Sequence, residues 1–167
     1  SIGYARFKES TNEYKPYLAI LGVNKEYFNE LKLKEGAFPK NDNEIVVSEH
    51  IKSNGGVTYN VGDSITLSYG TRNVDGETTL ENNEYKDGET LDIIGTKTYK
   101  IVGIVERSNY EDYSACGYSV FTLNNDIGNN ANLYLTFNKT KNIIDRSEKI
   151  ASQINYSKDK IIYNDSL

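Results

Sequence analysis

The sequence predicts an α+β fold in which two βαβ-like halves, one from each end of the chain, enclose a β-rich insertion. The first half is indicated by an apolar run at residues 17–21, a short segment with helical spacing, and a second apolar run from residue 44. The end of the chain repeats this order, with an alternating strand pattern at 133–137, a helical pattern over 142–155 and a strand at 160–163. The middle of the chain shows short strand patterns separated by clusters of Gly, Asn and Asp, which mark turns.

This pattern divides the chain into two parts. We expect residues 1–58 and 125–167 to form the α+β part, and residues 59–124 to form the inserted β-rich part. A chain of 167 residues is long enough for one domain, or for two small ones that share a core. Its 37% hydrophobic and 26% charged residues are typical of a folded, rather polar protein.

The charge pattern argues against nucleic acid as a partner. The 19 basic and 24 acidic residues give a net charge of -5, and the two signs are interspersed without a basic block. No apolar run approaches the roughly 20 residues that cross a bilayer. Cys116 is the only cysteine, so no intrachain disulfide can form.

In the first third of the chain we expect strands at residues 1–8 and 17–21, the second with both faces covered. Asn24 is a suitable N-cap for a short helix over residues 25–31, whose apolar side carries Tyr27, Phe28 and Leu31. One or two helical turns are expected over residues 48–53.

In the middle third, residues 64–69 alternate as a half-buried strand, and the β-branched run at 99–105 is a natural partner for it. Short strands at 77–80 and 90–94 are expected to form a polar hairpin, and a further strand is predicted at 118–123.

Two side chains invite a chemical interpretation. His50, the only histidine, follows Glu49 and could act in acid/base or metal chemistry, but no second His or Cys-x-x-Cys accompanies it. The alternative is a histidine at the surface or at the start of a helix. Cys116 could be a nucleophile, but no positioned base can be inferred for it, and its position after a tyrosine-bearing loop fits a semi-buried cysteine better. We predict no catalytic, cofactor-binding or metal-binding residue.

An acidic stretch in the middle of the chain admits two interpretations. Its carboxylates could bind calcium, although the EF-hand spacing is absent, or they could lie on a solvated hairpin. The residues concerned are Asp75, Glu77, Glu81, Glu84, Asp87, Glu89 and Asp92.

Tyrosine is unusually frequent, with 14 residues. Tyr110, Tyr113 and Tyr118 lie close together around one loop, where amphipathic rings could contact a protein or peptide. The alternative is that they pack on strand faces with their hydroxyls in water. We name these three tyrosines as candidate partner-binding residues.

Five segments follow one another in an order that is more specific than any of them alone. They are residues 22–28 (GVNKEYF), 33–39 (LKEGAFP), 44–49 (EIVVSE), 61–65 (VGDSI) and 99–105 (YKIVGIV). This order resembles the MacB-like extracytoplasmic core domain of FtsX/MacB-family ABC transporter permeases. The likeness covers essentially the whole chain; one departure is Ala37, where such domains often carry Arg after the Gly.

The resemblance implies a specific setting. The α+β part would be a porter-like subdomain and the insertion a sabre-like one, together forming the loop between the first two transmembrane helices of a permease. The domain would lie at the extracytoplasmic face of the cell membrane, on the extracellular side of a Gram-positive bacterium, and would work with a cytoplasmic ATPase subunit or domain. Relatives export antimicrobial peptides, toxins or antibiotics, handle lipoproteins, or transmit mechanical signals to outside partners.

We therefore expect a non-enzymatic domain without cofactors that binds a peptide substrate or an extracellular protein partner. The alternative is a freestanding bacterial cell-surface adhesion or binding module that uses the tyrosine loop for its contacts. A hydrolase built on the acidic residues has no support in the sequence, because nothing places two carboxylates across a cleft.

Overall fold

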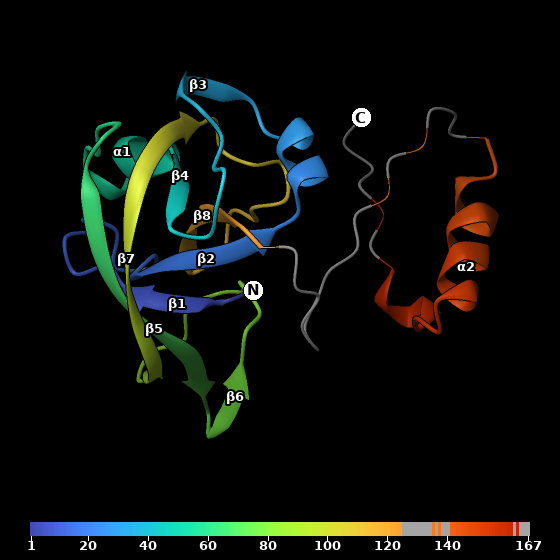
Figure 1. Cartoon of the computed structure of the whole chain (residues 1–167). Helices are drawn as coiled ribbons and strands as arrows, with labels where there is room; N and C mark the ends of the chain where they lie inside the picture. Colours follow the sequence, from blue (N-terminus) through green and yellow to red (C-terminus); the bar gives the residue numbers. More distant parts are fainter. Residues whose placement is uncertain (125–134, 136, 138–140, 162, 164–167) are drawn as a thin grey trace. The chain divides into compact units, whose positions relative to one another are not determined.

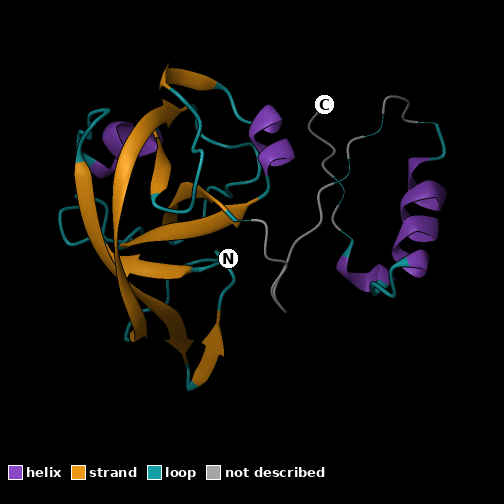
Figure 2. Cartoon of the chain, viewed as in Figure 1, coloured by secondary structure: helices purple, strands orange, loops and turns teal. Residues whose placement is uncertain are grey.

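The computed structural model describes residues 1–124, 135, 137, 141–161 and 163 of the chain. The chain divides into two compact units, Ser1–Ala131 and Asn132–Leu167 (Figure 1). Figure 2 shows that strands dominate the first unit and that its helices are short.

The first unit is a closed, six-stranded mixed β-barrel with two further strands at its margins. The strands are β1 (Gly3–Arg6), β2 (Tyr17–Val23), β3 (Leu33–Gly36), β4 (Glu44–Ser48), β5 (Ser64–Val74), β6 (Glu77–Thr79), β7 (Thr90–Val105) and β8 (Gly117–Leu123). Around the barrel the order is β7-β4-β8-β2-β1-β5, and β5 pairs with β7 to close it. The marginal strands β3 and β6 pair with β7 and β5, respectively.

The predicted α+β fold, with a porter-like subdomain and a sabre-like insertion, is wrong. The strands β2 and β4, assigned to the first βαβ-like half, are not neighbours, because β8 lies between them. Since β8 is parallel to β2 and antiparallel to β4, the first half contains no parallel strand pair joined by a crossover helix. The strands β5, β7 and β8, expected in a separate insertion, instead complete the barrel with β1, β2 and β4.

The predicted hairpin between residues 77–80 and 90–94 is also wrong. Strand β6 folds back on β5 through Asp75 and Gly76, whose φ angles are 52° and 85°. Positive φ at both central residues is the geometry of a type I′ turn, for which Asp-Gly is a favoured sequence. Residues 90–94 continue into the predicted strand 99–105 and form with it the 16-residue β7.

The predicted pairing of the strand at 64–69 with the one at 99–105 is confirmed, with Ile65 opposite Tyr99. A register shift between Tyr69 and Gly70 lets β5 bend, as a β-bulge does. The backbone of β7 approaches so closely there that a Cβ at Gly70 would lie 1.8 Å from the Asp92 carbonyl oxygen, so only glycine fits.

Side chains of the barrel strands are buried on both faces of the sheet. One apolar cluster fills the interior and contains Ala5, Phe7, Leu18, Ile20, Ile45, Val47, Ile51, Leu67, Tyr99, Ile101, Tyr118 and Val120. A second contains Val46 of β4, Phe121 of β8 and the aromatic residues of the short helix η1 (Lys25–Glu30). A third joins Tyr4, Tyr17 and Cys116 with apolar residues 80, 85 and 91. The prediction that the strand beginning at residue 17 has both faces covered is therefore confirmed.

The two predicted short helices of this unit are confirmed. In η1, a 3-10 helix, the Asn24 side chain accepts a hydrogen bond from the Tyr27 N–H at 3.1 Å and so acts as the expected N-cap. Its apolar side chains Tyr27, Phe28 and Leu31 are buried. The expected turns near residue 50 form α1 (His50–Gly55), whose Ile51 packs in the barrel interior.

The second unit contains α2 (Ile143–Gln153), as predicted, and the short 3-10 helix η2 (Lys158–Lys160). Within it, the Ser147 hydroxyl donates to the Ile144 carbonyl at 2.8 Å and lies 2.9 Å from the Tyr163 hydroxyl. The predicted strand at 133–137 falls largely on residues outside the described part. The strand predicted at 160–163 is not seen there: Lys160 is the last residue of η2, residues 161 and 163 belong to no strand, and residue 162 lies outside the described part. None of the helices described here has the length and apolar composition needed to cross a bilayer.

Candidate functional site: a groove between two anchored loops

The loop between β6 and β7 (residues 80–89, the first loop) is anchored by a buried ion pair. Arg72 of β5 and Glu89 both have fully buried side chains, and Arg72 donates from Nε and Nη2 to the two carboxylate oxygens at 2.8 and 2.7 Å. The other guanidinium hydrogens bond the Glu81 and Glu84 carbonyls and Asn83 Oδ1 at 2.7–3.0 Å. All five donors of the guanidinium are thus used.

Burial and pairing act on these two groups in opposite directions. Burial alone would lower the pKa of the Arg72 guanidinium and raise the pKa of the Glu89 carboxyl. Burial is the largest single influence on each group, but hydrogen bonds and nearby charges together outweigh it, so the pKa of Arg72 is raised and the pKa of Glu89 is lowered. The Lys86 N–H, which donates to Glu89 at 2.9 Å, adds to the second effect. Both groups are therefore charged at neutral pH.

The first loop also docks on the loop that precedes β8 (residues 107–117, the second loop). There the Asn82 side-chain amide makes the two hydrogen bonds to Gly117 that the backbone of a neighbouring strand would make. Its Oδ1 accepts from the Gly117 N–H at 3.0 Å, and its Nδ2 donates to the Gly117 carbonyl at 3.1 Å. Glu84 and Ala115 form an isolated antiparallel bridge between the same loops. The two loops consequently lie side by side.

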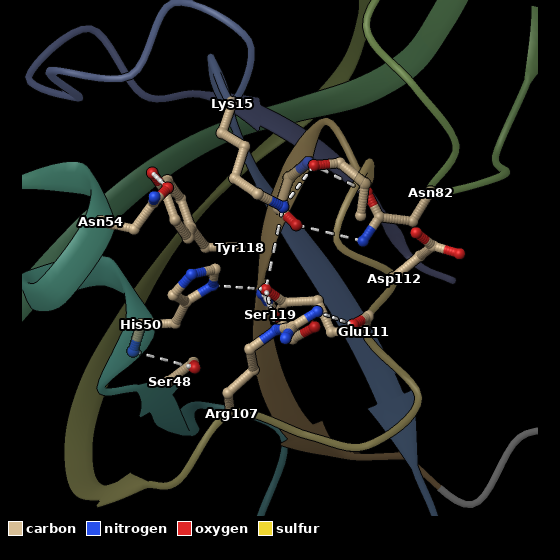
Figure 3. A network of polar contacts seen from close by, with 12 residues as sticks. Lys15, Ser48, His50, Asn54, Asn82, Arg107, Glu111, Asp112, Tyr118 and Ser119 are labelled. Carbon is tan, nitrogen blue, oxygen red and sulfur yellow. Dashed lines mark hydrogen bonds and ion pairs between the residues drawn. The ribbon is translucent and has the colours of Figure 1, made fainter. Parts of the chain in front are cut away.

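The second loop is anchored by another buried carboxylate, that of Glu111 (Figure 3). His50 Nδ1 lies 2.9 Å from Glu111 Oε1, while Lys15 Nζ and Arg107 Nε lie 3.9 and 3.7 Å from the same oxygen. The other oxygen, Oε2, accepts from the Ser119 N–H of β8 at 2.9 Å. Figure 3 shows these side chains converging on Glu111 from α1, from the chain before β2 and from the second loop itself.

Lys15 is the most deeply buried of the three side chains that face Glu111, with 5% of its side chain exposed. Its ammonium donates to the Ala115 carbonyl, so it joins the chain before β2 to the second loop. Burial lowers the pKa of Lys15, and the nearby Glu111 carboxylate opposes this effect. Arg107 donates to the Glu111 carbonyl, which closes the second loop on itself.

The contact between His50 and Glu111 resembles the base and orienting carboxylate of a catalytic triad, but the third member is missing from the described residues. Among those residues, no hydroxyl or thiol bonds to the His50 ring, and the Ser48 hydroxyl instead accepts a hydrogen bond from the His50 backbone N–H at 3.2 Å. His50 is the first residue of α1, as the helix-start interpretation expected.

Cys116 is fully buried, and burial raises the pKa of its thiol to about 12. A thiol in that state is a poor nucleophile at neutral pH. The sequence allowed either a nucleophile or a semi-buried thiol; Cys116 is in fact more deeply buried than the second interpretation expected, in the apolar cluster with Tyr4 and Tyr17.

Between the two loops and the chain before β2 lies a surface groove of about 250 Å³. It is lined by Asn12, Tyr14, Lys15, Glu84, Tyr85, Tyr113, Ser114 and Ala115. Tyr14 is 70% exposed and Tyr113 84% exposed, whereas Tyr85 packs its ring against Tyr17 at 6.2 Å. The groove therefore combines two open aromatic rings with one supported ring and the carboxylate of Glu84.

The three tyrosines named from the sequence do not share one surface. Tyr113 lines the groove, and Tyr110 is 41% exposed on the same loop but does not line it. Tyr118 is fully buried inside the barrel, where its hydroxyl donates to Asn54 Oδ1 at 2.8 Å. Tyr14 and Tyr85, which complete the groove, are far from Tyr113 in sequence. The high number of tyrosines in the chain was the only signal that could have drawn attention to them.

The acidic stretch does not behave as one surface either. Glu89 is buried and paired with Arg72, while Glu84 is exposed beside Lys86 at 3.6 Å. Across the described part of the chain, no group of three or more His, Cys, Asp or Glu side chains could hold a metal ion. Comparison with protein-family models and with curated proteins finds no match to the chain.

Proposed function

We propose that this chain is the non-catalytic, extracytoplasmic domain of an ABC transporter permease, and that it binds a peptide-like substrate or a protein partner in the tyrosine-lined groove. The observation that carries the binding role is the groove itself. The exposed rings of Tyr14 and Tyr113 come from separate segments and line the same groove, and the buried carboxylates of Glu89 and Glu111 anchor the two loops that form it. Tyrosine rings with one apolar and one wet end are typical contact groups of protein interfaces.

The permease setting is supported by where the resembling segments lie. Residues 22–28 lead from β2 into η1, residues 33–39 contain β3, and residues 44–49 and 99–105 belong to β4 and β7. The strands β3, β7 and β4 are neighbours in the sheet. Apolar residues of η1, β4 and β7 also meet in one cluster. Four of the five segments therefore lie along one side of the barrel, and the fifth, residues 61–65, leads into β5, which is the other neighbour of β7.

In this setting the chain is joined to transmembrane helices of its own permease and works with a cytoplasmic ATPase subunit or domain. It lies on the extracellular side of the membrane of a Gram-positive bacterium. The proposal covers export of, or resistance to, antimicrobial peptides or antibiotics, lipoprotein handling, and mechanical signalling across the membrane.

The first test is to extend the reading frame by about 60 residues in each direction and to search for spans of at least ~18 apolar residues. Spans on both sides support the permease. An anchor on one side only favours a surface adhesion module, which would use the same exposed tyrosines. Soluble sequence or a stop codon on both sides overturns the permease proposal.

A further inference from the structure

We propose that the groove between the two loops binds an arginine side chain of a peptide or protein partner, with the guanidinium against Tyr14 and Tyr113 and its charge facing Glu84. This inference rests on the proposed binding function and specifies the ligand. It does not depend on the permease setting, because the argument uses only residues of the groove.

The first support is a guanidinium that already lies on one of the groove tyrosines. The Arg107 guanidinium lies 3.9 Å from the centroid of the Tyr113 ring, which is the geometry of a close cation–π contact. Tyr113 nevertheless remains 84% exposed, so most of its surface is still open to a ligand. The chain itself thus shows that this ring accepts a guanidinium.

The same preference recurs throughout the protein. Each of the four arginines in the sequence lies over an aromatic ring: Arg6 over Tyr17 at 4.7 Å, Arg72 over Tyr4 at 5.6 Å, Arg107 over Tyr113 and Arg146 over Phe137 at 4.6 Å. The planar guanidinium suits such stacking better than the compact, strongly hydrated ammonium of lysine does. An arginine-bearing partner would repeat a contact that this chain makes with itself.

The charge of the groove is complementary to a cation. Glu84 lines the groove with its side chain 69% exposed, and Glu13, next to Tyr14, is also exposed. The one lysine of the groove, Lys15, has its ammonium turned to the Ala115 carbonyl and Glu111 below the surface. Arg107, the cation that lies on Tyr113, faces the same Glu111 carboxylate at 3.7 Å. Lys86 pairs with Glu84 only at 3.6 Å and across solvent, a weak contact that a bound guanidinium can replace.

The size of the groove decides between a small-molecule ligand and a side chain. Its volume of about 250 Å³ is below the roughly 300–1,000 Å³ of pockets that enclose drug-sized ligands. A groove of this size accommodates one long side chain of a larger partner. This fit favours a long side chain carried by a peptide over a free organic ligand.

The test uses three fluorescently labelled, capped hexapeptides in which glycine alternates with arginine, lysine or citrulline, and measures binding by anisotropy at low salt. Citrulline has the shape of arginine without its charge. We expect saturable binding of the arginine peptide, weaker binding of the lysine peptide and none of the citrulline peptide. Equal binding of the three peptides, or no saturable binding of the arginine peptide, overturns the inference.

Variants locate the site. Tyr14→Leu and Tyr113→Leu should each weaken binding of the arginine peptide by about three- to fivefold, the effect of one exposed cation–π contact. Tyr110→Leu, on the same loop but outside the groove, should leave binding unchanged. Glu84→Gln should weaken binding, whereas Glu77→Gln, which makes the same charge change on β6, should not. An equal effect of the groove variants and their controls places the peptide elsewhere and overturns the inference.

These outcomes are separable from the proposed function. Flanking membrane spans without arginine-peptide binding leave the permease proposal standing and remove this inference. Arginine-specific binding without flanking spans removes the permease proposal and leaves this inference standing. The groove would then be the contact site of a surface binding module.

Discussion

Two fully buried carboxylates, Glu89 and Glu111, anchor the two loops of the groove in different ways. The Glu89 carboxylate pairs with a single arginine, Arg72, whose five donors are all used, two of them on the carboxylate itself. Glu111 shares its charge among Lys15, His50 and Arg107, and its closest contacts are the His50 ring and the Ser119 N–H, both at 2.9 Å.

The difference teaches how a binding surface can be rigid at one wall and adjustable at the other. A bidentate arginine–carboxylate pair has one favourable geometry, so the first loop has one position on the barrel. Two cationic side chains and a histidine ring, which come from three segments, can share a carboxylate in more than one arrangement. We therefore expect the first anchor to determine stability and the second to determine the position of Tyr113.

The largest loss of stability is expected when one member of the Arg72–Glu89 ion pair is removed. Arg72→Met leaves the Glu89 carboxylate buried without its partner, and such a change costs about 3–5 kcal/mol of unfolding free energy. Urea denaturation followed by circular dichroism measures this loss.

The double variant Arg72→Met/Glu89→Leu is the matched control for that measurement. It removes both charges, and apolar replacement of a buried pair is often close to neutral. We expect it to recover most of the lost stability. If the double variant is as unstable as Arg72→Met alone, the cost lies in the contacts of Arg72 with the loop carbonyls rather than in the unpaired charge.

A smaller loss of stability is expected when the charge of Glu111 is removed. Glu111→Gln keeps an oxygen that can accept from the Ser119 N–H but loses the charge that faces Lys15, Arg107 and the His50 ring. We expect a loss of about 2 kcal/mol, the range for hydrogen bonds to charged groups. We also expect weaker binding of the arginine peptide, because the loop that carries Tyr113 is less well held. A loss equal to that of Arg72→Met would remove the distinction between the two anchors.

Acid should destabilise the protein by protonating Glu89 of the Arg72–Glu89 ion pair. The pKa of Glu89 is lower in the folded protein than its ordinary value, so its contribution to stability is complete above the unfolded value of about 4.3 and is lost as pH falls through the folded value. The urea midpoint of the wild type should therefore fall more steeply below pH 4 than that of Arg72→Met/Glu89→Leu. Parallel curves for the two proteins would contradict this assignment.

The smallest effect is expected for an exposed ion pair of the same charge type. Glu106 pairs with Lys32 at 2.8 Å at the protein surface, where solvent screens the contact. Glu106→Gln should leave the urea midpoint unchanged within error. A clear shift would show that burial is not what distinguishes Glu89 and Glu111 from other carboxylates.

Much of the local structure could be predicted from the sequence. The strand at residue 17, the Asn24 cap and helix α2 lie where the pattern placed them, since each depends on residues a few positions apart. The type I′ turn at Asp75-Gly76 was also visible in the sequence, but the following strand was paired with the wrong neighbour. Local spacing indicates a strand without saying which strand lies beside it.

The anchors of the groove could not be predicted in the same way. Arg72 lies between Gly70 and Gly76, in one of the Gly-, Asn- and Asp-rich stretches that were expected to be turns. Glu89 lies in the acidic stretch, for which we considered only a calcium site or a solvated hairpin. Neither residue carries a local signal of burial. The tyrosine loop did attract attention, which identified Tyr113. Its partners Tyr14 and Tyr85 join it only when the loops are folded together.

The sequence by itself determined the elements that short-range forces stabilise: apolar alternation in β5, the capped helix η1 and the amphipathic helix α2. Only the tertiary structure decided that six strands close into a barrel, with Tyr17 of β2 parallel to and opposite Gly117 of β8. It also decided that His50 meets Glu111 across 61 positions. The physical reason is that barrel closure and the burial of charge depend on contacts between distant residues, whose free energy no local pattern records.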